Sequence, residues 1–328
     1  MSVKPHDRLA AALRDDLTAV NDLIRERMAS ENAPRIPEVT AHLVEAGGKR
    51  VRPMLTLAAA GICGYQGAFH VHLAATVEFI HTATLLHDDV VDESDQRRGR
   101  PSANLLWDNQ SSVLVGDYLF ARAFQLMTEP GRMDVLRVLS NAAATIAEGE
   151  VLQLTAAQNL STTEETYLKV VRGKTAALFS AATEVGGMIA DADTGVVKAL
   201  HTYGDALGVS FQIADDVLDF DGDAAQTGKN VGDDFREKKL TLPLIKAISK
   251  ADEAERSFWK RTIEQGKQGD GDLEECLALL AKHGAIEEAR TEALSWAETA
   301  KAALDGVPDH PMKEMLADLA DYVVARIN

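Results

Sequence analysis

Two acidic clusters in the sequence have the residue types and the spacing to bind divalent cations. The segments LLHDDVVDESD and QIADDVLDFDGD both contain the pattern D-D-x-x-D after an apolar run. Residues four apart share a face of a helix, so Asp88 lies beside Asp92. By the same spacing, Asp215 lies beside Asp219. Like charges so placed repel each other, and a cation must offset the repulsion.

The ligand type indicates which cation this would be. An EF-hand calcium loop needs alternating oxygen ligands with a central Gly and a terminal Glu, and neither cluster has that sequence. Magnesium keeps several waters and is usually held by one or two carboxylates plus substrate phosphates. Two helices with a carboxylate pair each therefore predict magnesium ions that bridge to a diphosphate. A solvated acidic helix end is the alternative for one cluster alone, and the repetition on two apolar helices disfavours it.

Basic residues recur close to the acidic clusters, as a diphosphate site requires. GGKRVRP (47–53) places three cations in a glycine-led turn before a helix, and QRRGRPS (96–102) directly follows the first cluster. Further basic positions are Arg172 and Lys174 in R-G-K-T, Lys229 in T-G-K-N, and Lys238 and Lys239 before T-L-P. Each basic turn alone would be an ordinary solvated surface, and their repetition near the clusters is what indicates phosphate binding.

Two other motifs fit the sequence less well. The G-K-T that ends at Thr175 resembles the end of a nucleotide-binding P-loop, but the earlier glycine of that loop would fall at Leu168 and no strand precedes it. Glu78 and His81 match the E-x-x-H of di-iron helical bundles, which need a second such motif and two further Glu ligands. A non-catalytic metal-carboxylate bundle therefore stays as an alternative.

Helices must position these residues, because the sequence favours no other element. Apolar residues recur at three- and four-residue steps, and no segment alternates as a strand does. The pattern predicts helices over 54–63, 69–92, 111–128, 133–157, 162–185, 194–220 and 285–304. Thr162 and Glu165 have the spacing of a capping box at the start of one of them. Without a Gly/Ser/Pro-rich linker, we expect an all-α fold in a single domain over residues 1–328.

The composition excludes several classes of function. Asp and Glu number 51 against 34 Lys and Arg, a formal net charge of −17, which argues against a nucleic-acid partner. Cys63 and Cys276 are too few for a disulfide framework and suit a reducing cytosol. The sequence contains no run of about 18 apolar residues, so no transmembrane helix is predicted. The N-terminus does not resemble a signal peptide. We therefore expect a cytoplasmic protein.

In its motifs, the chain resembles the trans-type polyprenyl diphosphate synthases. Five segments match that family's signature regions in order: GGKRVRP, LLHDDVVDESDQRRGRPS, the G-K-T at 173–175, FQIADDVLD (211–219) and GKNVGDDFREKKLTLP (228–243). The resemblance implies one large bundle of α-helices around a deep central cavity, generally in a homodimer. Members of the family elongate an allylic diphosphate, such as farnesyl diphosphate, by adding isopentenyl diphosphate head to tail.

The resemblance also implies a role for each matched residue. Three magnesium ions per active site would be held by Asp88, Asp92 and Asp215, supported by Asp89, Asp216 and Asp219. The allylic diphosphate would contact Arg97, Lys174, Gln212, Lys229 and Lys239. Isopentenyl diphosphate would contact Lys49, Arg52, His81 and Arg98. Catalysis would depend on Asp88, Asp215, Lys174 and Thr175, the last beside the reacting carbon. Relatives often have Gly-Lys where this chain has Lys238-Lys239, and counting back from Thr241 favours Lys239 as the phosphate contact.

The helix that carries the first cluster is also expected to set the product length. Ala83 and Thr84 lie one turn before Asp88 and Ile80 lies two turns before it, with a rise of about 5.4 Å per turn. In the family, a bulky side chain four or five positions before the motif is expected to block the growing chain, like a floor to the cavity, and so to stop elongation. Small residues there favour a long product, as in bacterial octaprenyl-to-decaprenyl synthases, which supply the ubiquinone side chain.

Other interpretations stay open from the sequence alone. The small residues on this helix would also be explained by packing against a neighbouring helix, and a floor from another helix would give a geranylgeranyl or farnesyl product. A terpene cyclase ionises similar substrates but has no need of the basic GGKRVRP and QRRGRP segments. An inactive partner subunit of a two-component synthase tends to lose the aspartates that are complete here.

Overall fold

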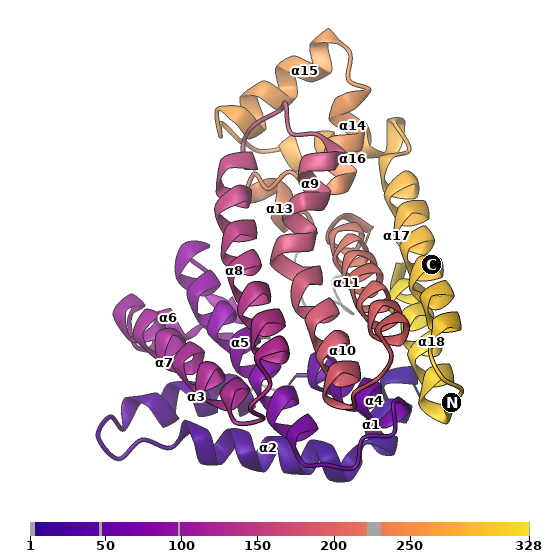
Figure 1. Ribbon diagram of the computed structural model, residues 1–328. Helices are drawn as coiled ribbons and strands as arrows, with labels where there is room; N and C mark the ends of the chain where they lie inside the picture. The colour runs from indigo at the N-terminus through magenta and orange to yellow at the C-terminus, as the bar shows by residue number, and fades with distance from the viewer. Residues whose placement is uncertain (1–3, 46–47, 98, 222–230, 328) are drawn as a thin grey trace. The chain divides into compact units, whose positions relative to one another are not determined.

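The computed structural model describes residues 4–45, 48–97, 99–221 and 231–327. Almost all regular structure in these residues is helical, as Figure 1 shows, and the all-α prediction is confirmed. In this part of the chain, no helix is both long and apolar enough to cross a membrane.

One short hairpin is the exception to the helical structure. Strand β1 (Gln96–Arg97) pairs antiparallel with β2 (Arg100–Pro101) inside the QRRGRPS segment. Gly99 in the connection has a φ of 73°, a left-handed conformation that costs glycine little. Strands of two residues are too short to show an alternating pattern, which is why the sequence analysis predicted none.

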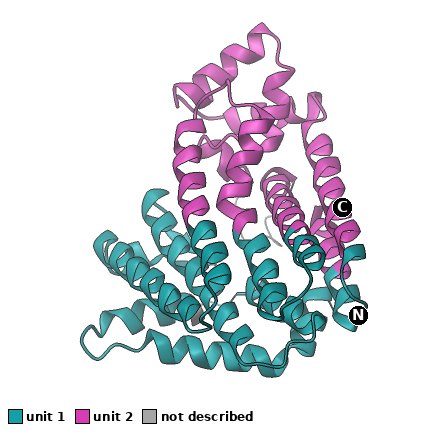
Figure 2. Ribbon diagram, viewed as in Figure 1, with its two compact units in different colours: residues 1–143, 178–201, 305–316 teal, residues 144–177, 202–304, 317–328 magenta. Residues whose placement is uncertain are grey.

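The helices are distributed over two compact units, coloured separately in Figure 2. Unit 1 consists of Met1–Ala143, Leu178–His201 and Asp305–Leu316, and unit 2 of Ala144–Ala177, Thr202–Leu304 and Ala317–Asn328. The elements that contribute residues to both units are α8 (Met133–Ala156), α10 (Ala177–Ile189), α11 (Thr194–Asp221), η3 (Leu304–Gly306) and α18 (Pro311–Val324). The unit boundaries thus fall within regular structure rather than in linkers.

Unit 1 is built around the long helix α5 (Phe69–Val91), which packs against α2, α4 and α7. Its other helices are α1 (Pro5–Ala12), α2 (Arg14–Met28), α3 (Arg35–Glu45), α4 (Val51–Ile62), α6 (Ala103–Leu106) and α7 (Asn109–Thr128). Leu73, Val77 and Ile80 of α5 are fully buried. Helix α10 comes close to α4, because a Cβ atom on Gly186 would lie 2.5 Å from the carbonyl oxygen of Thr56.

Unit 2 has an aromatic core. Its elements are α9 (Glu164–Val171), the π-helical turn η1 (Arg172–Ala176), α13 (Asp233–Arg236), α14 (Leu242–Ser249), α15 (Glu253–Trp259), the π-helical turn η2 (Lys260–Glu264), α16 (Asp272–Lys282), α17 (Ala285–Ala303) and the 3₁₀ turn η4 (Ala325–Ile327). Trp259 is fully buried, and its ring lies 4.9 Å from that of Phe258 and 6.5 Å from that of Phe235. Helix α14 packs against α16 and α17.

The helices predicted from the sequence agree with the structure to within a few residues, with one informative difference. The expected helix over 162–185 is three elements, α9, η1 and α10, and the capping box at Thr162 and Glu165 is wrong by one residue. The cap is Thr163, which accepts from the backbone N–H of Thr166 at 3.2 Å. Thr162 instead donates its hydroxyl to the carbonyl of Ala156.

Candidate active site

The first acidic cluster lies at the C-terminal end of α5, in unit 1. Asp89 is fully buried in the last turn, Asp88 is half-buried beside it, and Asp92 is the residue that ends the helix. The amide of Asp92 donates to the carbonyl of Asp88 at 2.8 Å. A helix C-terminus already carries partial negative charge, so three carboxylates there require positive charge nearby.

Arg97 on β1 supplies part of that positive charge. Its Nε and Nη2 atoms donate to Oδ1 of Asp89 at 2.8 and 2.5 Å. Burial raises the pKa of Asp89, and the bonds to Arg97 oppose that rise. The other oxygen, Oδ2, is also buried, and no hydrogen-bond partner for it occurs among the described residues. The hairpin thus places Arg97 directly beside the first cluster.

Residues predicted to hold isopentenyl diphosphate meet between α4 and α5. Arg52 Nη1 donates to Nε2 of His81 at 3.2 Å, and the Arg52 guanidinium lies 4.4 Å from the ring centre of Phe179. Lys49 is exposed, just before the residue that caps α4. Arg98 lies outside the described residues.

The second acidic cluster lies on α11, in unit 2. Asp216 and Asp219 are buried, whereas Asp215 is half-buried and lies 3.6 Å from Nη2 of Arg326. Tyr167 on α9 donates its hydroxyl to Asp216 Oδ2 at 2.5 Å. Burial raises the pKa of Asp216 to about 7, against the bonds that favour its ionised form.

A chain of hydrogen bonds joins this cluster to the G-K-T segment. Thr175 donates to Oε1 of Gln212 at 2.8 Å, and Gln212 Nε2 donates to Oδ1 of Asp216 at 2.8 Å. Because an amide has both a donor and an acceptor, Gln212 transmits the orientation of Asp216 to the Thr175 hydroxyl. The structure thus brings together three residues that the sequence analysis assigned to the site.

The π-helical turn η1 gives the G-K-T segment its position. Single π turns inside helices occur frequently at functional sites, because the extra residue changes which side chains face inward. At Gly149 and Gly173 the backbones of α8 and η1 touch, since a Cβ atom on Gly149 would lie 2.6 Å from the Lys174 amide nitrogen. Lys174 Nζ pairs with Glu150 at 2.9 Å.

The segment before T-L-P returns to the second cluster. The amide of Asp234, in the first turn of α13, donates to Asp219 Oδ2 at 3.1 Å, and the amide of Gly232 donates to the Asp219 carbonyl at 2.8 Å. Lys239 Nζ lies 2.7 Å from Glu237, and Lys238 has a left-handed φ of 59°. Which of these lysines contacts a diphosphate stays a prediction. Lys229 lies outside the described residues.

The positions predicted to set product length lie on α5 between the buried core and the first cluster. Ala83 and Ile80 are fully buried, and Thr84 is half-buried with its hydroxyl donating to the carbonyl of His81 at 2.8 Å. All three side chains are small or aliphatic, as the sequence analysis required.

Several residues that shape the site were missed by the sequence analysis. Tyr167 and Arg326 contact the second cluster, and Glu150 pairs with Lys174. None carries a local signal, because each is separated along the chain from the residue that it contacts. Glu78 was noticed for the E-x-x-H spacing, and in the structure its side chain forms an ion pair with Arg50.

The carboxylates fit magnesium held partly by substrate. No group of three or more His, Cys, Asp and Glu residues within the described ranges is arranged to hold a metal by itself. A site that takes one or two carboxylates and completes its shell with phosphate and water needs no such group. The clusters offer oxygen ligands alone, and the buried Oδ2 of Asp89 is an acceptor suited to a cation or its water.

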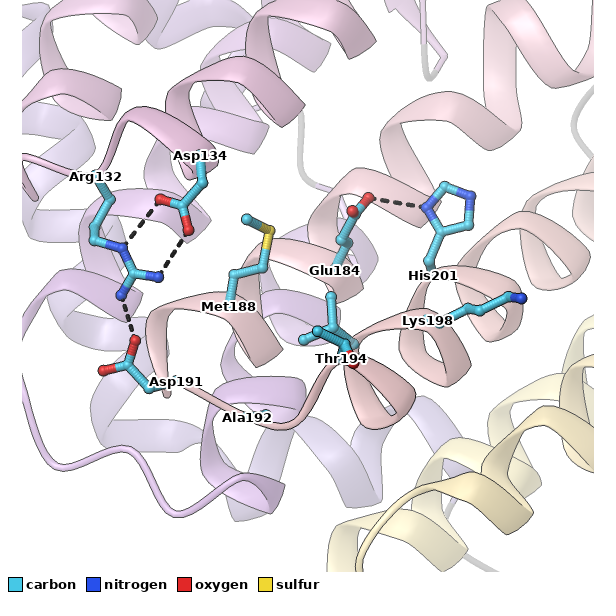
Figure 3. A pocket seen from close by; sticks show the side chains of 10 residues that line it. Arg132, Asp134, Glu184, Met188, Asp191, Ala192, Thr194, Lys198 and His201 are labelled. Atoms are coloured by element: carbon cyan, nitrogen blue, oxygen red, sulfur yellow. Dashed lines mark hydrogen bonds and ion pairs between the residues drawn. The ribbon is translucent and has the colours of Figure 1, made fainter.

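One hollow of about 570 Å³ in unit 1 does not belong to this site. Figure 3 shows Arg132 between Asp134 and Asp191, with Glu184 facing His201. No residue predicted for diphosphate or metal binding lines it. Arg132 pairs with Asp134 and Asp191, and His201 pairs with Glu184, so most of its charged side chains are engaged in ion pairs.

Comparisons with known proteins agree with this geometry. The family model described as Polyprenyl synthetase matches residues 33–280. The octaprenyl diphosphate synthase of Escherichia coli K12 is 46% identical over 311 residues, which cover 95% of this chain and 96% of that relative. The all-trans-nonaprenyl-diphosphate synthase (geranyl-diphosphate specific) of Rhodobacter capsulatus is 42% identical over the full length of both chains.

Solved structures give the same result. A decaprenyl diphosphate synthase from Rhodobacter capsulatus superposes with a TM-score of 0.96 at 71% identity, covering 98% of this chain and 99% of that one. A polyprenyl synthase from Caulobacter crescentus CB15, complexed with calcium and isoprenyl diphosphate, superposes with a TM-score of 0.94 at 46% identity over 99% of each chain. The fold is thus that of the helical isoprenoid synthases. The chain belongs to the polyprenyl synthetase family and is a trans-prenyltransferase, which excludes the non-catalytic bundle.

Proposed function

We propose that this enzyme condenses isopentenyl diphosphate head to tail onto an allylic diphosphate to make a long-chain all-trans polyprenyl diphosphate. The observation that carries the long-chain product is the set of small and aliphatic residues, Ala83, Thr84 and Ile80, in the two turns of α5 before Asp88. Relatives named for octaprenyl, nonaprenyl and decaprenyl products support it. A product of that length suits the side chain of ubiquinone.

Magnesium is the metal we propose, with three ions per site. Its ligands would be Asp88, Asp92 and Asp215, with Asp89, Asp216 and Asp219 in support. When bound, the ions supply positive charge that stabilises the diphosphate leaving group. The relative complexed with calcium and isoprenyl diphosphate supports a divalent cation with a diphosphate in this family.

Basic side chains, together with the amide of Gln212, bind and orient the two diphosphates. Arg97, Lys174, Gln212, Lys229 and Lys239 would contact the allylic diphosphate, and Lys49, Arg52, His81 and Arg98 would contact isopentenyl diphosphate. Positive charge fixed in place before the reaction stabilises negative charge as it develops on the leaving group. Lys174 is suited to this, since its ion pair with Glu150 holds the ammonium in one position.

The reaction starts when the allylic C–O bond ionises and leaves a delocalised carbocation and diphosphate. The double bond of isopentenyl diphosphate forms the new C–C bond, and the proton lost from the adduct passes to the departed diphosphate. The Thr175 hydroxyl donates its hydrogen to Gln212, which leaves the lone pairs of its oxygen available to stabilise the cation. Water has to be excluded, because it would quench the cation.

We also propose one catalytic domain, in a homodimer located in the cytoplasm. The unit boundaries within helices support the single domain. Exposed apolar side chains on α6 and α7, which are Leu105, Leu106, Val113, Leu114 and Phe124, support a covered surface in the dimer.

The decisive experiment is product analysis. Purified enzyme is incubated with farnesyl diphosphate, labelled isopentenyl diphosphate and Mg²⁺, and the product is separated by chain length. We expect consumption of isopentenyl diphosphate that stops with a chelator, returns with Mg²⁺ and is reduced at least about a hundredfold in Asp88→Asn. Extension of farnesyl diphosphate by a single isopentenyl unit would identify a geranylgeranyl synthase. Extension of geranyl diphosphate but not of farnesyl diphosphate would identify a farnesyl synthase. Full activity of folded Asp88→Asn would contradict the metal role.

A further inference from the structure

Glu78 is a buried carboxylate that the proposed function leaves unexplained. It lies in the middle of α5 with 4% of its surface exposed, among apolar neighbours. Its Oε1 accepts a short hydrogen bond from Nη1 of Arg50. A buried charge is tolerated when it is paired and hydrogen-bonded, so Glu78 and Arg50 form one unit.

Arg50 is held in an unusual backbone conformation. Its φ and ψ are 49° and 33°, in the left-handed region that side chains with a Cβ rarely adopt. It directly precedes α4, and its carbonyl accepts from the amide of Met54 at 3.0 Å. Nε also lies 3.4 Å from the side-chain oxygen of Asn21. Such a conformation persists when the surroundings fix it from several sides, and it is often found at functional sites.

A second contact, one turn further along α5, also links residues 50–52 to that helix. Arg50 bonds Glu78, and Arg52 bonds His81 one helical turn further along. Positions three apart on a helix lie on the same face, so two successive anchors hold residues 50–52 along α5. Lys49 immediately precedes the first anchor.

We propose that the Arg50–Glu78 ion pair positions the isopentenyl diphosphate site, which rests on the proposed function. The pair does not contact substrate. It fixes the backbone between Lys49 and Arg52, so that both cations and His81 are placed before the diphosphate arrives. Glu78 also neutralises Arg50, which would otherwise be an uncompensated cation between Lys49 and Arg52.

The test separates binding of the two substrates. Glu78→Gln keeps the shape of the side chain and removes its charge, and Arg50→Ala removes the partner. Both variants should raise KM for isopentenyl diphosphate by about tenfold or more while KM for farnesyl diphosphate changes little, because only one diphosphate site loses its geometry. The double variant should be no worse than the poorer single variant, since both changes break one interaction.

A matched control is the ion pair of Arg27 with Glu129, also in unit 1. Glu129→Gln makes the same chemical change and should leave both KM values unchanged. Calorimetric titration of isopentenyl diphosphate alone should show the same loss of affinity in Glu78→Gln. If Glu78→Gln and Arg50→Ala lower only the melting temperature, or raise both KM values equally, the inference is wrong. If the wild-type enzyme consumes no isopentenyl diphosphate, the proposed function fails instead.

Discussion

The hydroxyl of Tyr167 donates to the buried carboxylate of Asp216 at 2.5 Å, from a different helix of unit 2. Gln212 donates to the other oxygen of the same carboxylate. Both donors favour the ionised form of Asp216, which burial opposes. The carboxylate is thus held in one orientation by two neighbours, which offset part of the rise in its pKa.

Tyr167→Phe should therefore weaken magnesium activation. Loss of an outer partner of a metal-supporting carboxylate typically lowers metal affinity about 10- to 100-fold, and we expect the Mg²⁺ concentration for half-maximal activity to rise in that range. Titration of the initial rate with Mg²⁺ measures it. Tyr118→Phe is the control, because its hydroxyl bonds Arg122 and the carbonyl of Ala29 in unit 1. An unchanged Mg²⁺ dependence in Tyr167→Phe would mean that the Tyr167–Asp216 bond does not affect metal binding.

Gly149→Ala should destabilise the protein. The added Cβ would meet backbone atoms of Gly173 and Lys174 at 2.6 to 2.9 Å, and backbone cannot move aside as a side chain can. Overpacking of this kind costs about 1–3 kcal/mol. Urea unfolding measures the change. Gly195→Ala in the first turn of α11, where a Cβ meets nothing within 4 Å, should be neutral or slightly stabilising. Equal stability of the two variants would show that the backbones separate at little cost.

Ala83→Phe should shorten the product by at least one isoprene unit. Ala83 is fully buried one turn before Asp88, so a ring there takes space along the path expected for the growing chain. Because overpacking costs about 1–3 kcal/mol, the smaller change Ala83→Leu accompanies it. Chromatography of the dephosphorylated products gives the length. The same product from wild type and both folded variants would remove Ala83 as a determinant of length.

Glu255 should make stability depend on pH in the acid range. Its buried carboxylate bonds Lys282, His283 and the amide of Asp252, and these bonds, with Lys282 foremost, lower its pKa to about 2. A lowered folded-state pKa gives stability that is present above the ordinary value of 4.5 and is lost as pH falls toward 2.

The measurement compares wild type with Glu255→Gln by thermal unfolding. The variant should melt lower at pH 7, and the difference should shrink as pH falls below about 4.5. Glu264→Gln, at an exposed position of the same unit, should show no such convergence. A difference between wild type and Glu255→Gln that stays constant down to pH 3 would contradict the assignment.

Periodicity and motif spacing predicted the helices that carry the site, including the D-D-x-x-D segments at the ends of α5 and α11. The exact start of a helix and the type of a single turn were predicted less well, because one hydrogen bond decides each of them. The cap of α9 is Thr163 rather than Thr162: the Thr163 oxygen accepts from the amide of Thr166, whereas the hydroxyl of Thr162 donates to the carbonyl of Ala156. The π turn at Arg172–Ala176 was likewise invisible, because its apolar spacing over a single turn resembles that of an α-helix.

Long-range partners were beyond the sequence altogether. Tyr167 and Asp216 are 49 residues apart, and nothing in the local pattern of α9 distinguishes this tyrosine from a core residue. Glu78 shows the opposite problem. Its spacing to His81 suggested a metal motif, whereas in the structure Glu78 bonds Arg50 and His81 bonds Arg52.

Asp219 serves two structures at once. Its Oδ2 belongs to the acidic cluster of α11 and is also the acceptor for the first turn of α13. A ligand that drew this oxygen away would deprive the Asp234 amide of its partner. The order of residues 231–236 and the affinity of the cluster are therefore thermodynamically linked, and each must change the other by the same free energy.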